Sequence, residues 1–128
     1  MEGYDEKFDK IRDIVSSMAM SNYKSFYPEY IKKSMPELSL EDIICKLEPL
    51  RKEGAIVLRF EIRCTDDFTV LDVVDNYTDV IGTEIYCREC EKDIYIAEEN
   101  IYPKYFINDQ YCKYLKKKSK TEQLLAHN

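Results

Sequence analysis

Residues 39–54 read SLEDIICKLEPLRKEG, and this stretch has the features of one complete helix. Ser39, with Asp42 three residues later, is typical of a helix N-terminus, because such side chains bond to the otherwise unpaired amides of the first turn. Gly54 suits the left-handed residue that often ends a helix. Pro49 lies inside, where we expect a kink or a loosened last turn. The apolar residues share one helical face: Leu40, Ile43, Ile44, Leu47 and Leu50.

The next stretch, residues 56–64, reads IVLRFEIRC and alternates apolar with polar residues. This period of two predicts a strand with one buried face, on which Cys64 also falls. Cys64 begins a Cys-x-x-Asp sequence that ends at Asp67, and nineteen residues separate it from the Cys-x-x-Cys sequence of Cys87 and Cys90. Two ligand pairs with this spacing predict turns that could share one metal ion.

The order of helix, glycine, strand and paired ligands resembles a winged helix-turn-helix domain that runs into a zinc ribbon. The resemblance implies an α+β fold, with a three-helix winged-helix-like domain at 1–63 and a small antiparallel zinc-ribbon-like β-domain at 64–107. A basic C-terminal helix and tail would follow at 108–128. The resemblance also implies a zinc ion, held by Cys64, Asp67, Cys87 and Cys90, although the family has a cysteine where this chain has Asp67. Three outcomes stay open: this ligand set, a set completed by Cys112, or a ribbon without metal.

The flanking segments predict the remaining elements. Residues 5–19 have apolar residues at helical spacing, and Pro28 suits the first turn of a short helix that ends before Pro36. Residues 68–74 predict a strand or a short helix, and short strands are expected at 94–96 and 105–107. Asn108 is a suitable N-cap for the last helix.

Composition points to the interior of a cell. No apolar run approaches the length of a membrane span, and the chain opens on acidic residues where a signal peptide would be basic and then apolar. Five cysteines, an odd number, suit reduced thiols or a metal better than a disulfide framework. We therefore expect a cytoplasmic, non-membrane, bacterial protein, whose oligomeric state the sequence does not define.

The charge distribution favours a protein partner over nucleic acid. Residues 1–50 have a net charge of −3, residues 51–103 of −7 and residues 104–128 of +4. The polar face of the helix at 39–54 offers carboxylates, which repel phosphates, where a DNA-reading helix offers basic or amide side chains. We expect it to bind a protein partner through Glu41, Asp42, Cys45 and Glu48. A DNA-binding alternative would use Arg59, Arg63, Lys113, Lys116, Lys117 and Lys118.

The residues needed for catalysis are not evident in the sequence. The one histidine is His127 near the terminus, and no serine or cysteine nucleophile has a plausible base near it in the sequence. The sequence also contains no glycine-rich phosphate-binding loop. We expect a non-enzymatic adaptor, and proteins similar in build suggest an accessory component of a bacterial multi-protein system such as phage defence. The alternatives are a winged-helix DNA-binding regulator and an acidic inhibitor or DNA mimic that binds a basic protein surface.

Overall fold

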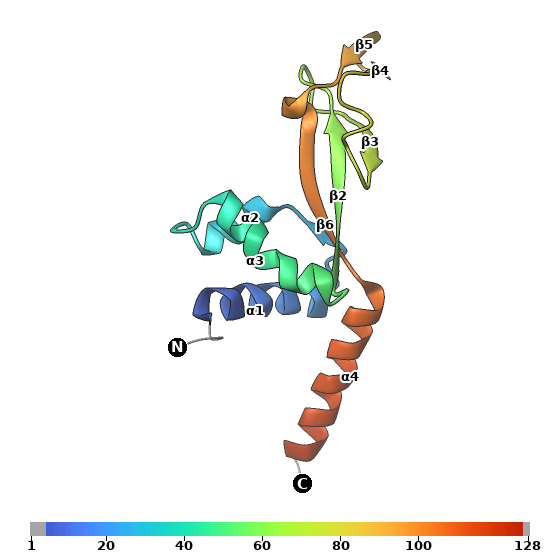
Figure 1. Ribbon diagram of the computed structural model, residues 1–128. Helices are drawn as coiled ribbons and strands as arrows, with labels where there is room; N and C mark the ends of the chain where they lie inside the picture. Colours follow the sequence, from blue (N-terminus) through green and yellow to red (C-terminus); the bar gives the residue numbers. More distant parts are fainter. Residues whose placement is uncertain (1–4, 127–128) are drawn as a thin grey trace. The chain divides into compact units, whose positions relative to one another are not determined.

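The computed structural model describes residues 5–126, and Figure 1 shows its α+β architecture. Two compact units are present: residues 58–104 form a β-unit, and residues 1–57 together with 105–128 form a helical unit. The α+β class is confirmed. The sequence predicts boundaries after residues 63 and 107, whereas the units change over inside two long strands. His127 lies outside the described residues, in which no helix has the length and apolarity of a membrane span.

The helical unit begins with α1 (Glu6–Met20), α2 (Pro28–Ser34) and α3 (Leu40–Lys52). Each begins where the sequence predicts. Asp5 accepts hydrogen bonds from the first-turn amides of α1, Pro28 opens α2, and the Ser39 hydroxyl accepts a hydrogen bond from the amide of Asp42 at 3.1 Å. α3 continues through Pro49 to Lys52, so the proline does not end it, and Gly54 adopts a φ of 83° just beyond.

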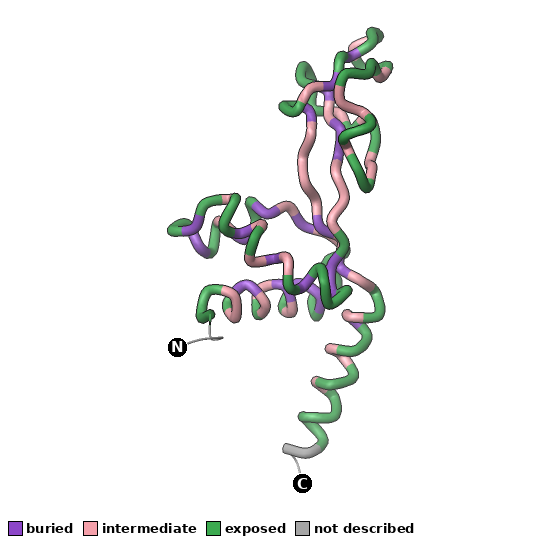
Figure 2. Tube along the Cα trace, viewed as in Figure 1, coloured by how far each residue is buried: buried purple, intermediate pink, exposed green. Residues whose placement is uncertain are grey.

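The three helices form the core of this unit, and each of them carries buried residues (Figure 2). Fully buried apolar side chains come from each helix at helical spacing, so the amphipathic pattern of the sequence is the pattern of burial. They include Ile11, Val15, Ile31, Ile43, Leu47 and Leu50.

A short strand and the last helix complete the helical unit. β1 (Ser25–Phe26), which the sequence does not predict, pairs antiparallel with β6 (Ile101–Ile107), and the rings of Phe26 and Tyr105 stack at 5.4 Å. α4 spans Asp109–Ala126. Asn108 caps it by accepting a hydrogen bond from the Gln110 amide at 2.8 Å, as predicted, and donates one to the Gly54 carbonyl at 3.0 Å.

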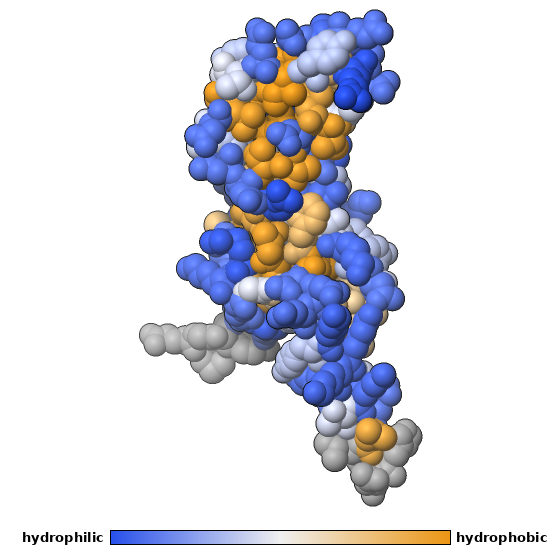
Figure 3. Space-filling model, turned by 90° about the vertical axis from the view of Figure 1, so that its right-hand side faces the viewer, coloured by the Kyte–Doolittle hydropathy of each residue, from blue (hydrophilic) through white to orange (hydrophobic). Residues whose placement is uncertain are grey.

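The β-unit is built from antiparallel strands. β2 (Ile56–Arg63) pairs with β3 (Val70–Val74), and the four-stranded sheet has the order β1-β6-β2-β3. β4 (Glu84–Cys87) and β5 (Lys92–Tyr95) form a separate ribbon, and a short 3₁₀ helix, η1 (Glu98–Asn100), follows. Apolar side chains gather on one face of this unit, over β3 (Figure 3).

Glu61 departs from the predicted alternation of β2. We expect its side chain on the solvent face, yet it is only 4% exposed. Its carboxylate pairs with Arg63 at 2.7 Å and with Lys104 at 3.1 Å, and the guanidinium of Arg63 also lies over the Tyr102 ring. Paired, hydrogen-bonded charges can be buried where an isolated one cannot. The hydropathy pattern alone does not reveal such partners.

Candidate metal centre

The first half of the centre is the turn after β2, which we call knuckle 1 (Cys64 to Thr69). The Cys64 carbonyl accepts a hydrogen bond from the Phe68 amide at 2.9 Å, and the Cys64 amide donates to the Thr69 carbonyl at 2.9 Å. The Thr69 amide donates to Oδ1 of Asp67 at 3.0 Å, which fixes the carboxylate and leaves Oδ2 for other contacts. Backbone bonds of this short turn thus bring the side chains of Cys64 and Asp67 together.

The second half is the turn between β4 and β5, knuckle 2 (Cys87 to Lys92). Its residues Cys87 and Lys92 are paired across the ribbon, and the Glu91 amide donates to the Cys87 carbonyl at 2.8 Å. This is the same bond that closes knuckle 1, from the fifth residue of the turn back to the first. The two knuckles therefore present ligands at equivalent positions, the first and the fourth. Lys92 also forms an ion pair with Asp66 of knuckle 1 at 2.7 Å.

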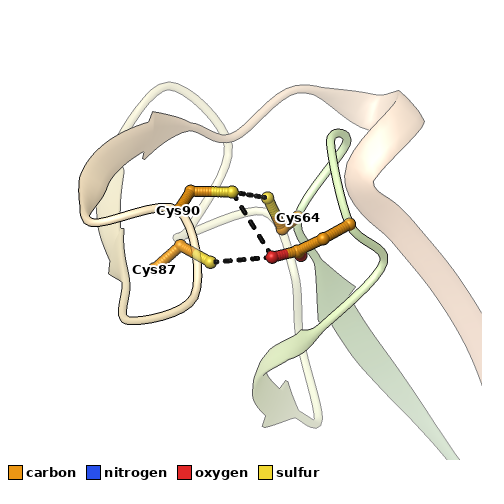
Figure 4. Close-up of side chains that lie close together, drawn as sticks. Cys64, Cys87 and Cys90 are labelled. Carbon is orange, nitrogen blue, oxygen red and sulfur yellow. Dashed lines mark hydrogen bonds between the residues drawn. The ribbon is translucent and has the colours of Figure 1, made fainter.

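Four ligand atoms converge between the knuckles (Figure 4). Oδ2 of Asp67 accepts hydrogen bonds from the thiols of Cys90 at 3.3 Å and Cys87 at 3.7 Å, and the sulfurs of Cys64 and Cys90 lie 3.6 Å apart. All four atoms lie within 4.8 Å of one another. Around a tetrahedral zinc ion, two thiolates are about 3.8 Å apart, and a thiolate and a carboxylate oxygen about 3.5 Å. The observed separations therefore fit a small tetrahedral ion, and the cluster could hold a metal ion.

The surroundings of the centre are apolar on one side and open on the other. Cys64 and Cys87 are completely buried, and a small core formed by Ile62, Ile94 and Ile96 packs against them. Cys90 is half-buried and Asp67 is exposed. A metal ion would therefore be anchored by two inner sulfurs and closed from the solvent side by the other two ligands.

The turn at η1 is fastened to the knuckle 1 strand. Asn100, which is 1% exposed, donates a hydrogen bond through Nδ2 to the Arg63 carbonyl at 2.8 Å. Its Oδ1 accepts from the Ala97 amide at 2.9 Å. Because Arg63 immediately precedes Cys64, this buried amide helps to fix the backbone that delivers the first ligand. The sequence gives no signal for this role.

The ionisation of the ligands follows from these contacts. The Thr69 amide, above all, lowers the pKa of Asp67 to about 2, so this carboxylate is charged at neutral pH. The hydrogen bond with Cys64, burial and the neighbouring Asp67 raise the pKa of Cys90 to about 12. Without a metal, Cys90 keeps its proton, which a bound cation must displace.

The structure brings together all four residues that the sequence predicts as metal ligands. Cys112, the alternative fourth ligand, is instead a buried residue of α4 in the helical unit and does not belong to the cluster. Four protein ligands leave no open coordination position, which is typical of structural rather than catalytic metal sites. The arrangement suits a role in holding the two knuckles together.

The predicted partner-binding residues lie on α3. Glu41, Asp42 and Cys45 are exposed, and Glu48 is half-buried. Arg51 forms an ion pair with Glu48 at 2.8 Å, and its hydrogen bond lowers the pKa of that carboxyl. The first turn of α3 therefore presents an acidic surface.

The residues of the DNA-binding alternative are partly neutralised. Arg59 pairs with Asp75 at 2.9 Å, Arg63 with Glu61 at 2.7 Å and Lys113 with Asp109 at 3.1 Å. The Lys116 ammonium donates a hydrogen bond to Asn22. Lys117 and Lys118 are exposed on α4. The acidic partners reduce the positive potential that phosphate binding requires.

No family model matches this chain, and neither the curated proteins nor the solved structures include a match to it.

Proposed function

We propose that this chain is a non-enzymatic protein-interaction module, an adaptor, whose β-unit is stabilised by a structural zinc ion. The observation that carries the proposal is the convergence of Cys64, Asp67, Cys87 and Cys90 within 4.8 Å, from two knuckles with the same closing hydrogen bond. Because all four ligands of such an ion would come from the protein, no coordination position would be open to a substrate. This supports a structural role for the metal.

Zinc suits this donor set better than the other common ions. Three thiolates are soft ligands that favour zinc or iron–sulfur chemistry, whereas calcium and magnesium take oxygen ligands. Asp67 is a less common but acceptable zinc ligand. When bound, zinc would join the two knuckles, and its binding free energy would become folding free energy of the β-unit.

The adaptor role draws on α3 and on the arrangement of the helical unit. Three helices, a short strand after the first helix, and paired long strands after the third support the resemblance to a winged helix. The surface of α3, however, is acidic, and the first-turn carboxylates Glu41 and Asp42 are exposed. This surface suits a protein partner and disfavours DNA.

The test is tagless purification from the native host, with mass spectrometry of bound proteins, nucleic acid and zinc in one eluate. We expect stoichiometric zinc, a protein partner, and no shift of DNA in a gel at about 150 mM salt. The double variant Glu41→Gln with Asp42→Asn should lose the partner. Its matched control, Glu6→Gln with Glu29→Gln, also removes two exposed first-turn carboxylates and should keep it.

Salt-dependent DNA binding, lost when Lys116, Lys117 and Lys118 are changed to Ala, would instead identify a DNA-binding regulator. A host protein that dissociates steeply with salt and is inhibited on binding would identify an acidic inhibitor. Either result would reject the adaptor role without affecting the zinc site, which the metal content tests separately.

A further inference from the structure

The ribbon of β4 and β5 has two chemically different faces. The register pairs Glu84 with Tyr95 and Tyr86 with Asp93, so these four side chains lie on one face. The residues between them lie on the other face, where Cys87 and Ile94 are buried in the core of the β-unit. All four residues of the outer face are exposed. We call this outer face the tyrosine–carboxylate face.

Each tyrosine of this face has a carboxylate directly across the ribbon. Side chains in such pairs have their Cβ atoms about 5 Å apart. Tyr86 is 56% exposed and Tyr95 is 63% exposed, so neither ring is used in the core. The Tyr95 hydroxyl lies beside Gly82, where a Cβ atom would be 3.9 Å away, so this ring leans along the ribbon toward residue 82. Two large aromatic rings, those of Tyr86 and Tyr95, are thus exposed to solvent on the paired strands β4 and β5.

The carboxylates of this face are not part of an ion pair within the described residues. In residues 5–126, no ion pair involves Glu84 or Asp93, although other acidic residues of the β-unit are paired, such as Asp66 with Lys92 and Asp75 with Arg59. The β-unit as a whole has five basic and twelve acidic side chains. Its field therefore attracts a basic partner and repels a nucleic acid.

A tyrosine ring next to a carboxylate is a good site for a cation. A Lys or Arg side chain over the ring is attracted by its π-electrons, and the carboxylate adds an ion pair or hydrogen bonds. The face has two such sites, Tyr86 with Asp93 and Tyr95 with Glu84. They are displaced by two residues along the ribbon, about 7 Å, which is also the distance between alternate side chains of an extended peptide.

We propose that the tyrosine–carboxylate face docks an extended segment of a partner protein that has Arg or Lys at alternate positions. Arg is preferred, because its flat guanidinium stacks on a ring while it donates to a carboxylate. The proposal rests on the proposed function as an interaction module and adds a second surface, separate from the one on α3. The two surfaces can therefore be tested independently.

The test is an NMR titration of the isotope-labelled, zinc-loaded full chain with a short peptide, acetyl-Thr-Arg-Thr-Arg-Thr-amide. We expect saturable shifts confined to residues 82–97. A peptide of the same composition with adjacent arginines should bind at least about tenfold more weakly, since its side chains cannot reach both sites. A peptide with Gln in place of Arg should not bind.

Matched variants assign the binding to the face. Tyr86→Ser with Tyr95→Ser should weaken binding by about tenfold or more, whereas Tyr114→Ser, which removes a similarly exposed ring from α4, should not change it. Glu84→Gln with Asp93→Asn should weaken binding and flatten its salt dependence. The control Glu98→Gln with Glu99→Gln removes two exposed carboxylates of the same unit and should leave binding unchanged.

Three results would overturn the proposal: unchanged binding by the tyrosine variant, equal affinity for both arginine spacings, or shifts on α3 instead of the ribbon. Self-association of the chain that the tyrosine variant abolishes would also overturn it, because the basic residues would then come from a second copy. If the tyrosine variant retains the host partner while the Glu41→Gln, Asp42→Asn variant loses it, that result would reject the tyrosine–carboxylate face as a docking site and leave the adaptor role standing.

Discussion

Phe68 and Glu91 occupy equivalent places in the two knuckles, four residues after Cys64 and Cys87, and both have left-handed backbones with φ of 61° and 56°. Each donates its amide hydrogen to the carbonyl of that cysteine. The left-handed region is costly for residues with a Cβ and is populated mainly by glycine. Because neither position holds glycine, the structure places strain at both ends of the metal centre.

Phe68→Gly should stabilise the zinc-loaded protein. Glycine avoids the strain of the left-handed backbone, and the lost ring is 57% exposed, so little packing is lost with it. After the entropy that glycine adds to the unfolded chain, we expect a gain of about 0.5–1 kcal/mol, measured by denaturant unfolding. Phe68→Ala keeps the strain and should show no such gain. An equal gain for Ala would mean that the ring, rather than the backbone, is the source.

Cys87→Ser should abolish stoichiometric zinc binding and loosen the β-unit. Cys87 is one of the two fully buried ligands, so its loss removes an inner anchor of the ion, and structural zinc contributes directly to folding. Metal content is measured by elemental mass spectrometry, and order in residues 58–104 by hydrogen exchange. Cys45→Ser, which changes an exposed thiol of α3, is the control and should leave both unchanged. Normal hydrogen exchange in a metal-free Cys87→Ser protein would reject a structural role for zinc.

Zinc affinity should rise with pH across the neutral range. The pKa of Cys90 is raised to about 12, so zinc must displace its proton, and affinity rises by about tenfold per pH unit for each proton released. Asp67, with a pKa of about 2, is already ionised and contributes no proton at neutral pH. Calorimetry in buffers with different ionisation enthalpies counts the protons. Release of no proton at pH 7 would contradict ligation by thiols.

The lowered pKa of Asp67 also has a consequence for stability. Because its folded-state pKa lies below that of the unfolded chain, its contribution is fully present above about pH 4 and is lost as the pH falls toward 2. Asp67→Asn should remove this acid-dependent component from the metal-free protein. Unfolding midpoints measured between pH 5 and pH 2, in the presence of a chelator, test this. Identical pH profiles of the two proteins would contradict it.

Tyr105→Phe should stabilise the helical unit. The Tyr105 side chain is 1% exposed, and its hydroxyl is buried without a hydrogen-bond partner among residues 5–126. Removing an unsatisfied buried hydroxyl should raise the free energy of unfolding by about 1 kcal/mol. Burial raises the pKa of Tyr105 to about 12. The free energy of unfolding is therefore unaffected by this group below pH 10 and falls between pH 10 and 12, because the hydroxyl ionises first in the unfolded chain. Tyr105→Phe should lose less stability over that interval, and equal losses would contradict the assignment.

The sequence predicts the elements whose signals are local. Ser39 and Gly54 mark α3 because a capping hydroxyl and a left-handed residue act within a few positions of the chain. The four residues of the candidate metal centre could also be named, because three cysteines and an aspartate in two pairs of fixed spacing after a strand favour a shared metal ion. Cys112 remained an alternative until the fold placed it on α4.

The sequence does not predict features that depend on distant partners. β1 is two residues long and exists because β6 returns beside it, some 80 residues later. Glu61 can be buried because it pairs with Arg63 and with Lys104, which lies 43 residues later in the chain on the neighbouring strand β6. The left-handed backbones of Phe68 and Glu91 are imposed by the knuckles, and no glycine signals them. The tyrosine–carboxylate face requires the pairing of β4 with β5, which assigns residues to faces.

The β-unit is inserted into the helical unit, which the chain leaves along β2 and re-enters along β6, two neighbouring strands of one sheet. Residues 58–104 are therefore an insertion whose two ends lie on neighbouring strands. Replacing this segment by another would leave the order of the helices before and after it unchanged. Because the two crossover points, after residues 57 and 104, lie inside β2 and β6, any engineered replacement must continue both strands side by side in the sheet.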